Sequence, residues 1–208
     1  MQNLPTIVTP FDPALDELCQ ELTTAASETD LDHRWPARQL ELCGSYGVYR
    51  WFVKTSDGGL EWSDGDIARG YLRLAEACLT TSFIITQRTG ALQRFAGMAG
   101  DAIKATYLPD LLSGKLFATI GISHLTTSRQ HVQPVLQARE TADGFELNGF
   151  SPWVTGAAHA STVVTGAVLE DGGQILVALP TNLPGVSVPP TPRLVGISAS
   201  HTGEVRMD

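Results

Sequence analysis

The chain has 208 residues, 43% of them hydrophobic, and a formal net charge of -8. This length and apolar content suffice for one large domain or two small ones with a buried core. Because acidic residues outnumber basic ones on both sides of residue 116, the charge argues against binding to nucleic acid or to an anionic membrane surface.

Cysteine usage and the N-terminus predict a cytoplasmic protein. The three cysteines are far apart and lie in apolar helical patterns without a CxxC motif, so we interpret them as reduced core residues. The start, MQNLPTIVTPFDP, lacks the basic and apolar runs of an export signal, and no apolar stretch approaches the ~18 residues of a membrane span. The histidines are scattered without ligand spacing, so we predict no metal site.

Apolar residues recur at helical spacing throughout residues 1–115 and predict an N-terminal α-helical domain. Capping residues mark two helix starts: Asp12 precedes Pro13, and Ser63 opens an acidic first turn. Pro109 lies inside the last apolar stretch and predicts that it is divided into two short helices. The expected helices begin at Pro13 and near Ser63 and otherwise span 36–44, 82–96, 101–108 and 109–113.

After Leu116 the apolar period changes from 3.6 residues to about 2, which predicts an antiparallel β-barrel domain over residues 116–208. Asp143 and Gly144 predict a tight turn. The expected strands span 117–123, 134–140, 145–150, 161–169, 175–179, 186–188 and 203–207. The predicted fold class is therefore α+β and multidomain, with an all-α N-terminal domain followed by an antiparallel β-barrel.

Two polar clusters flank a predicted hairpin between Leu116 and Thr155. The first contains Ser123 and residues 126–129, and the second is the tripeptide 153–155, of sequence Trp-Val-Thr. Folding of the hairpin brings the two clusters together. An indole face, hydroxyl groups and strand-end amides suit a flat heteroaromatic ligand better than a phosphate alone or a metal.

Four segments carry a resemblance to a known family. They are DLLSGKLFATIGISH, DGFELNGFSPWVTGAAHASTVVTGAV, LPGV and SASHTGEVRMD, in that order. Together they resemble the N-terminal helical and middle β domains of the acyl-CoA dehydrogenases, over essentially the whole chain. The most specific element is DGFELNGFSPWVTGAAHAS, which has the family's Asn-Gly strand, Trp-x-Thr turn and following small residues.

The resemblance implies a flavoprotein that uses FAD. It implies that the Trp153 indole lies against the flavin ring and that the Thr155 hydroxyl meets the flavin N5 region. Ser123 keeps the hydroxyl of the family's Thr-Glu-Pro segment, whereas His124 and Leu125 replace its Glu-Pro. The cofactor-binding residues implied in this way are Ile120, Ile122, Ser123, Ser128, Trp153, Val154 and Thr155, and those implied for the substrate are Ser128 and Arg129.

Each of the main candidates also has an ordinary structural interpretation. Trp153 is compatible with capping the barrel core, and Thr155 with a turn-forming hydroxyl. We interpret His124 as a loop residue rather than an acid or base, because no partner carboxylate can be identified in the sequence.

The family's activity implies oxidation of an acyl thioester at its α,β carbons, by proton abstraction and hydride transfer to flavin N5. The implied partners are acyl-CoA or an acyl-carrier thioester, an electron-acceptor flavoprotein, and other subunits of a homo-oligomer or hetero-oligomer. In the family a C-terminal four-helix domain supplies the glutamate base, and we find no counterpart of it, so we assign no catalytic residue. Three explanations stay open: a fragment, one half of a split enzyme, or a truncated binding module.

Two alternative functions also stay open. One is a flavin-dependent monooxygenase or oxidase on the same fold, which the altered segment SHLTTSR favours. The other is a non-catalytic subunit that completes a homologous partner, which the missing base domain favours.

Overall fold

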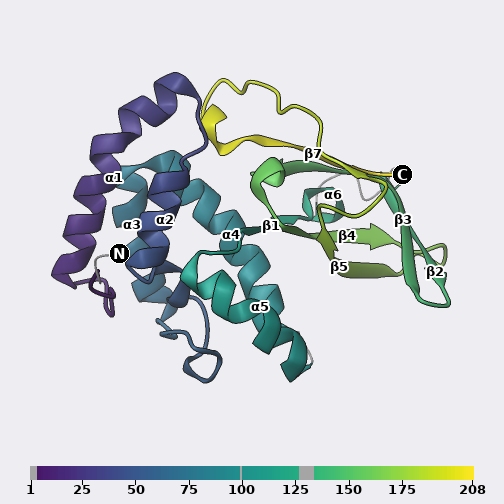
Figure 1. Ribbon diagram of the computed structural model, residues 1–208, viewed down its shortest axis with the longest axis horizontal. Helices are drawn as coiled ribbons and strands as arrows, with labels where there is room; N and C mark the ends of the chain where they lie inside the picture. The colour runs from purple at the N-terminus through teal and green to yellow at the C-terminus, as the bar shows by residue number, and fades with distance from the viewer. Residues whose placement is uncertain (1–3, 99, 127–133) are drawn as a thin grey trace. The chain divides into compact units, whose positions relative to one another are not determined.

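A computed structural model describes residues 4–98, 100–126 and 134–208, which form two compact units (Figure 1). The helical unit comprises Met1–Phe117 and Leu194–Ser200. The β unit comprises Ala118–Arg193 and His201–Asp208. The predicted fold class, α+β with an N-terminal helical domain followed by a β-barrel domain, is confirmed, and the barrel is a curled half-barrel sheet.

The helical unit consists of amphipathic helices whose starts follow the predicted capping residues. The Asp12 side chain accepts a hydrogen bond from the Ala14 amide at 3.0 Å, and the Ser63 hydroxyl accepts one from the Asp66 amide. The helices are α1 (Pro13–Asp32), α2 (Ala37–Ser45), η1 (Val48–Arg50), η2 (Thr55–Asp57), α3 (Asp64–Ala77), α4 (Leu79–Gly97), α5 (Asp101–Ser113) and η5 (Ser198–Ser200).

The predicted division at Pro109 is wrong, because α5 continues through this residue to Ser113. A proline removes one backbone donor from a helix, but packing on both sides of it can keep the helix continuous. Here Leu108 and Leu111 are both buried. The helix ends at Gly114, whose positive φ of 82° forms the left-handed cap.

The core of the helical unit is apolar, with one buried guanidinium. Trp51 stacks on Trp62 at a centroid distance of 4.1 Å and donates through Nε1 to the Ile7 carbonyl oxygen at 3.2 Å. Arg88 lies 3.7 Å from the centroid of the Tyr49 ring. The aliphatic core includes Leu15, Leu18, Leu22, Leu74, Ile84, Ile85 and Leu92.

The β unit is one strongly curled, half-barrel sheet in the order β1-β4-β2-β3-β7-β6, with β5 paired to β4. It is mixed rather than purely antiparallel, because β1 runs parallel to β4 and β2 meets β4 in parallel at one pair. The strands are β1 (Ala118–Gly121), β2 (Leu136–Thr141), β3 (Gly144–Thr155), β4 (Thr162–Val168), β5 (Gln174–Pro180), β6 (Val186–Ser187) and β7 (Thr202–Met207).

In the part of the β unit that the structure describes, two short helices interrupt the strands, and one of them replaces predicted strand. The strand expected over 117–123 ends at Gly121, and the helical turn α6 (Ser123–Thr126) follows it. The second is η4 (Ala157–His159), between β3 and β4. The strand expected over 145–150 is longer than predicted, because β3 continues to Thr155 through an irregularity described below.

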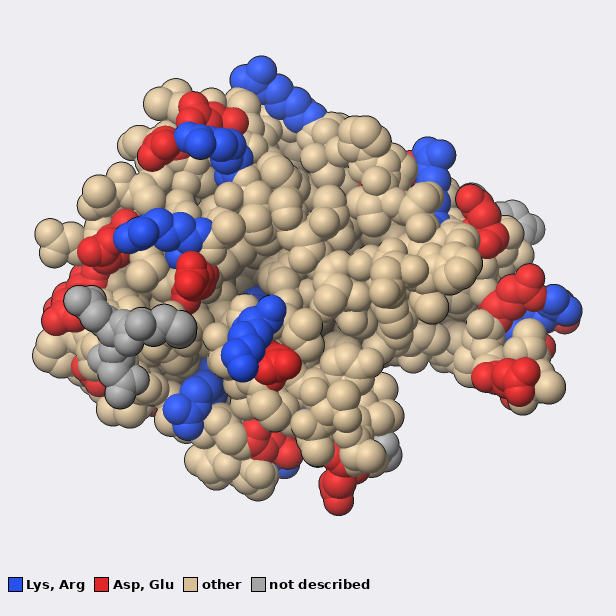
Figure 2. Space-filling model, viewed as in Figure 1, with Lys and Arg blue, Asp and Glu red and all other residues tan. Residues whose placement is uncertain are grey.

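Charged side chains of both signs are interspersed over the face shown in Figure 2. Several form ion pairs, such as Arg139 with Glu146 across β2 and β3. In the described part of the chain, no helix is long and apolar enough to cross a membrane.

Candidate functional site

The candidate site forms where β3 and β7 lose their regular register. The two strands pair regularly up to Ser151 of β3 and again from Val154. In the interval β7 contributes only Glu204, whereas β3 contributes both Pro152 and Trp153. Two residues opposite one make a β-bulge, which bends the strand and changes the direction of its side chains. A proline is tolerated there because the bulge residue need not donate to the ladder.

The bulge presents Trp153 to solvent in an unfavourable backbone conformation. Its φ is 56°, in the left-handed region that bulky residues seldom adopt, and its side chain is 63% exposed. Backbone strain of this kind is concentrated at binding and catalytic sites. The exposed indole on this strained backbone is therefore a candidate stacking surface.

A cavity of about 600 Å³ opens at the bulge, and we call it the Trp153 cavity. This volume is within the roughly 300–1,000 Å³ of typical small-molecule sites. The apolar wall consists of Phe150, Pro152, Trp153, Pro189, Pro190 and Pro192. The remaining lining residues are Gly203 and three with polar side chains, Ser123, His124 and Glu204.

The turn α6 is anchored to two strands of the sheet. The Ser123 hydroxyl donates to the Pro152 carbonyl oxygen at 3.2 Å, beside the bulge. The His124 ring contacts the Gly166 carbonyl oxygen of β4 through Nε2 at 2.7 Å. A Cβ on Gly166 would lie 2.1 Å from Cδ1 of Leu125, so a larger residue there would displace this side chain. The anchors hold Ser123 and His124 in the cavity wall.

His124 is a buried, neutral imidazole with a defined tautomer. Because a carbonyl oxygen only accepts, Nε2 must carry the proton and donate it to Gly166. Nδ1 is then an acceptor, and it has no hydrogen-bond partner among the described residues. Burial lowers the pKa of His124 from 6.5, and the bond to the Gly166 carbonyl opposes this effect.

Glu204 is the carboxylate of the Trp153 cavity. Its Oε1 accepts from Nε of Arg206 at 2.7 Å and also contacts Nη2 at 2.5 Å. The neighbouring Gly203 allows residues 189–192 to lie close to β7, because a Cβ there would be 2.9 Å from Cγ2 of Thr191. This packing forms the proline side of the cavity.

The structure brings two of the predicted site residues into the same cavity, Ser123 and Trp153. It does not bring Thr155 into the lining. Thr155 is only 1% exposed, and its hydroxyl shares a 2.9 Å hydrogen bond with the hydroxyl of Thr202. The predicted contact of Thr155 with flavin N5 therefore stays a prediction.

The other described residues predicted for the site lie near the cavity in sequence but do not line it. Val154 is fully buried directly after Trp153, Ile120 is buried in β1, and Ile122 is partly buried between β1 and α6. Ser128 and Arg129 lie outside the described residues. Their predicted roles in binding cofactor or substrate stay predictions.

Sequence reasoning missed Glu204, Phe150 and the proline wall of the cavity. Pro152 did carry a signal, since a proline inside a strand pattern indicates an edge or a bulge. Glu204 carried none, because only the register of β7 against β3 places it opposite the bulge.

A second pair of polar side chains lies at the other end of the bulged segment. His159 Nε2 and His201 Nδ1 are 2.9 Å apart, so one ring donates to the other. Burial, and then the neighbouring His201, lower the pKa of His159. Within the described ranges, no group of three or more His, Cys, Asp or Glu side chains could hold a metal ion.

No family model matches the chain, but individual proteins do. It is 24% identical over 196 residues to probable acyl-CoA dehydrogenase YngJ of Bacillus subtilis, covering 91% of this chain and 51% of that protein. It is 25% identical over 196 residues to the mitochondrial short-chain specific acyl-CoA dehydrogenase of Bos taurus, covering 89% and 46%. The chain therefore spans about half the length of the curated relatives it matches.

Solved structures show the same fold at low identity. FkbI, a protein for biosynthesis of the methoxymalonyl extender unit of Fk520, matches with a TM-score of 0.81 and 24% identity over 93% of this chain and 54% of its own. A Mycobacterium smegmatis glutaryl-CoA dehydrogenase in complex with FADH2 matches with a TM-score of 0.80 and 16% identity over 96% and 53%. KijD3, in complex with FMN and a dTDP-sugar, matches with a TM-score of 0.76 and 22% identity over 99% and 53%.

Proposed function

Because this chain belongs to the acyl-CoA dehydrogenase family, over that family's N-terminal and middle domains, we propose that it is part of an FAD-dependent dehydrogenase. The whole protein would oxidise an acyl thioester, on coenzyme A or on an acyl carrier, at its α,β carbons. One observation carries the flavin assignment. Ser123 and the strained, exposed Trp153, about thirty residues apart in sequence, line the same cavity.

The chemistry of the Trp153 cavity fits an isoalloxazine ring. The Trp153 indole offers a flat surface for stacking, and the prolines around it add apolar surface beside it. Ser123 and Glu204 supply polar groups at the edge of this surface. The relatives solved with FADH2 and FMN support the choice of a flavin.

The protein's own part in the proposed reaction is to bind and orient. When bound, flavin supplies the acceptor for a hydride. The described residues would hold the ring through stacking on Trp153 and through the Ser123 hydroxyl, which is anchored to the Pro152 carbonyl oxygen. Ile120, Ile122, Val154 and Thr155 would support the cofactor from β1, the segment after it and β3, and Ser128 and Arg129 would face cofactor and thioester. We assign none of the described side chains as the base.

The proposal extends to partners. A thioester oxidation that loads electrons on flavin needs an acceptor for them, and we propose an electron-acceptor flavoprotein. We also propose that the protein works as a homo-oligomer or together with a related subunit.

A second candidate function keeps the flavin and changes the reaction. In α6 a buried His124 stands where the family shows a glutamate, and KijD3 is solved with FMN and a dTDP-sugar rather than a thioester. Both observations favour a flavin-dependent monooxygenase or oxidase on this fold. Consumption of oxygen by the reduced flavoprotein without turnover of acyl-CoA would select this candidate.

Flavin binding is tested directly by reconstitution with FAD. We expect the protein to bind FAD with the absorbance of a bound flavin, and Trp153→Ala to raise the Kd by about tenfold through loss of stacking. Phe145→Ala is the matched control, because Phe145 is an exposed aromatic residue of the same strand that does not line the cavity. A wild-type protein that shows no flavin absorbance after reconstitution would contradict the proposal.

A further inference from the structure

We propose that Glu204 is the residue by which the Trp153 cavity recognises its ligand: its carboxylate accepts a hydrogen bond from an N–H group on the edge of a heteroaromatic ring stacked on Trp153. The inference rests on the proposed function in one respect, since it uses the same cavity. It adds the polar group that fixes how the ring is oriented.

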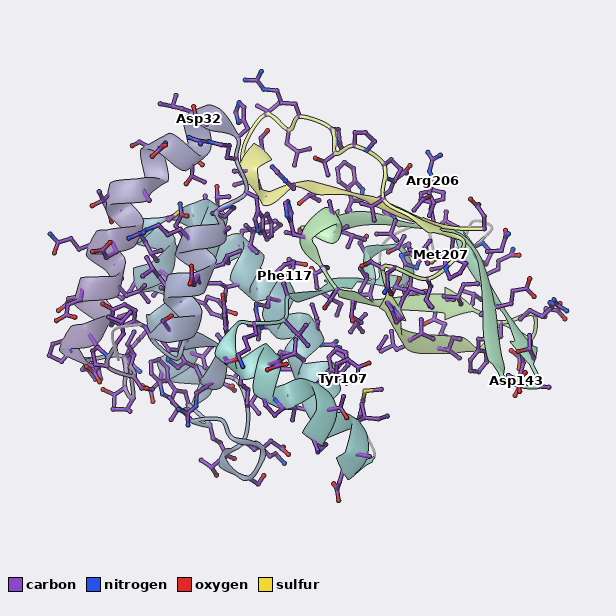
Figure 3. All side chains as sticks on the ribbon, in the orientation of Figure 1. Asp32, Tyr107, Phe117, Asp143, Arg206 and Met207 are labelled. Atoms are coloured by element: carbon purple, nitrogen blue, oxygen red, sulfur yellow. The ribbon has the colours of Figure 1, made fainter. Side chains whose placement is uncertain are left out.

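The bulge places Glu204 next to the stacking surface. Glu204 is the one residue of β7 in the interval that Pro152 and Trp153 occupy on β3. Side chains alternate along β7: Val205 and Met207 are buried, whereas Glu204 and Arg206 share the other face. In Figure 3 the labelled Arg206 and Met207 lie on opposite sides of this strand.

Arg206 holds the Glu204 carboxylate in one orientation. Both Nε and Nη2 of the guanidinium contact the same oxygen, Oε1, at 2.7 and 2.5 Å. Oε2 accepts no hydrogen bond from any described residue. An ion pair this exposed contributes little to stability. Because it uses only Oε1, it leaves Oε2 as an acceptor beside the cavity.

The surroundings define what this acceptor can bind. A carboxylate only accepts hydrogen bonds, so the ligand must bring a donor. The walls of the cavity are mostly apolar, and a hydrogen bond is stronger beside apolar walls than in water. A polar ligand without a donor for Glu204 would lose its hydrogen bonds to water and gain none here. A phosphate or carboxylate group is disfavoured at this point by charge repulsion. The exposed face of Trp153 selects a flat ring.

A flat ring with an N–H donor on its edge describes both ends of FAD. The isoalloxazine carries a ring N–H, and the adenine carries an exocyclic amine. Two probes separate these sources: FMN has the isoalloxazine without adenine, and AMP has adenine without the isoalloxazine. Each carries one phosphate, so their charges are matched.

The test measures the Kd of FMN and of AMP for the wild type and for Glu204→Gln. In the variant, the amide oxygen of Gln accepts from Arg206, as Oε1 does in the wild type. The amide NH2 then takes the place of Oε2. It is a donor, so it cannot accept a hydrogen bond from the ring N–H. We expect the Kd of one probe to rise by about 10- to 100-fold. Glu204→Ala should weaken the same probe less, because it removes the acceptor without adding a donor.

Glu140→Gln is the matched control, since Glu140 is exposed on β2 and does not line the cavity. An effect of Glu204→Gln on the Kd of FMN assigns the isoalloxazine as the ring bound, and an effect on the Kd of AMP assigns the adenine.

If FMN binds the wild type and both Gln variants equally, and AMP shows no difference either, the role of Glu204 is overturned while flavin binding stands. If only AMP binds, and depends on Glu204, the inference stands and the flavin assignment of the cavity fails. If neither probe binds the wild type, both fail.

Discussion

The two units use tryptophan in opposite ways. In the helical unit Trp51 is fully buried, stacks on Trp62 and donates its indole N–H to the Ile7 carbonyl oxygen. In the β unit Trp153 is 63% exposed and held at a positive φ. Burial of an indole stabilises a fold, whereas an exposed, strained one contributes little to it. The contrast separates the residues that hold this protein together from those available to a ligand.

The two units also differ in how they use a charged side chain. In the helical unit Arg88 is buried, and its Nη2 donates to the carbonyl oxygens of Leu111 and Leu116 at 2.5 and 2.8 Å. In the β unit Glu204 is partly exposed and keeps one oxygen without a partner among the described residues. The first charge satisfies backbone groups of its own unit, and the second is available to a ligand.

The largest expected effect tests the comparison between the two tryptophans. Trp51→Ala should lower the free energy of unfolding by about 3–5 kcal/mol, because it leaves a large cavity in the helical unit. Trp153→Ala should change it by less than about 0.5 kcal/mol, as expected for an exposed residue. Urea unfolding followed by circular dichroism measures both. A loss of stability in Trp153→Ala comparable to that in Trp51→Ala would favour the other interpretation, in which Trp153 caps the barrel core.

A smaller effect is expected from the buried charge. Arg88→Met should lower the free energy of unfolding by about 1–3 kcal/mol, because the Leu111 and Leu116 carbonyls lose their donor and the Tyr49 ring loses its cation. Arg94→Met is the control on the same helix, since Arg94 is exposed and should contribute less than about 0.5 kcal/mol. Equal stability of the two variants would show that Arg88 is not an organising residue of the helical unit.

The sequence predicted best those features that depend on nearby residues. Helix starts follow from caps such as Asp12 and Ser63, and strands follow from alternation, so most of these elements were found close to their observed bounds. Pro109 is one exception: its local effect on the backbone is real, but packing of Leu108 and Leu111 keeps α5 continuous.

Features that depend on long-range register could not be predicted in the same way. The parallel pairing of β1 with β4 joins residues more than forty positions apart, and no local pattern specifies it. The bulge is also a property of two strands together, which is why Trp153 could be proposed from its motif but Glu204 could not. The juxtaposition of Ser123 and Trp153 was predicted because a hairpin joins their segments.

The smallest expected effect concerns pH and should come from the β unit, where the pKa values of His124 and His159 are lowered. Burial lowers the pKa of His124 below its ordinary 6.5 in the folded state, so the unfolded state binds the proton more readily. The stabilising effect of neutral His124 is therefore complete above the unfolded pKa and is lost as the pH falls below 6.5 toward the folded pKa.

His124→Gln should keep a donor for the Gly166 carbonyl but no longer titrate. Between about pH 7.5 and 5.5, the free energy of unfolding measured in urea should therefore decline less steeply in this variant than in the wild type. His159→Gln tests the second contribution separately, because the ring of His159 contacts His201 rather than the Gly166 carbonyl that His124 contacts. Equal slopes for the wild type and His124→Gln would mean that the buried His124 imidazole does not set the pH response.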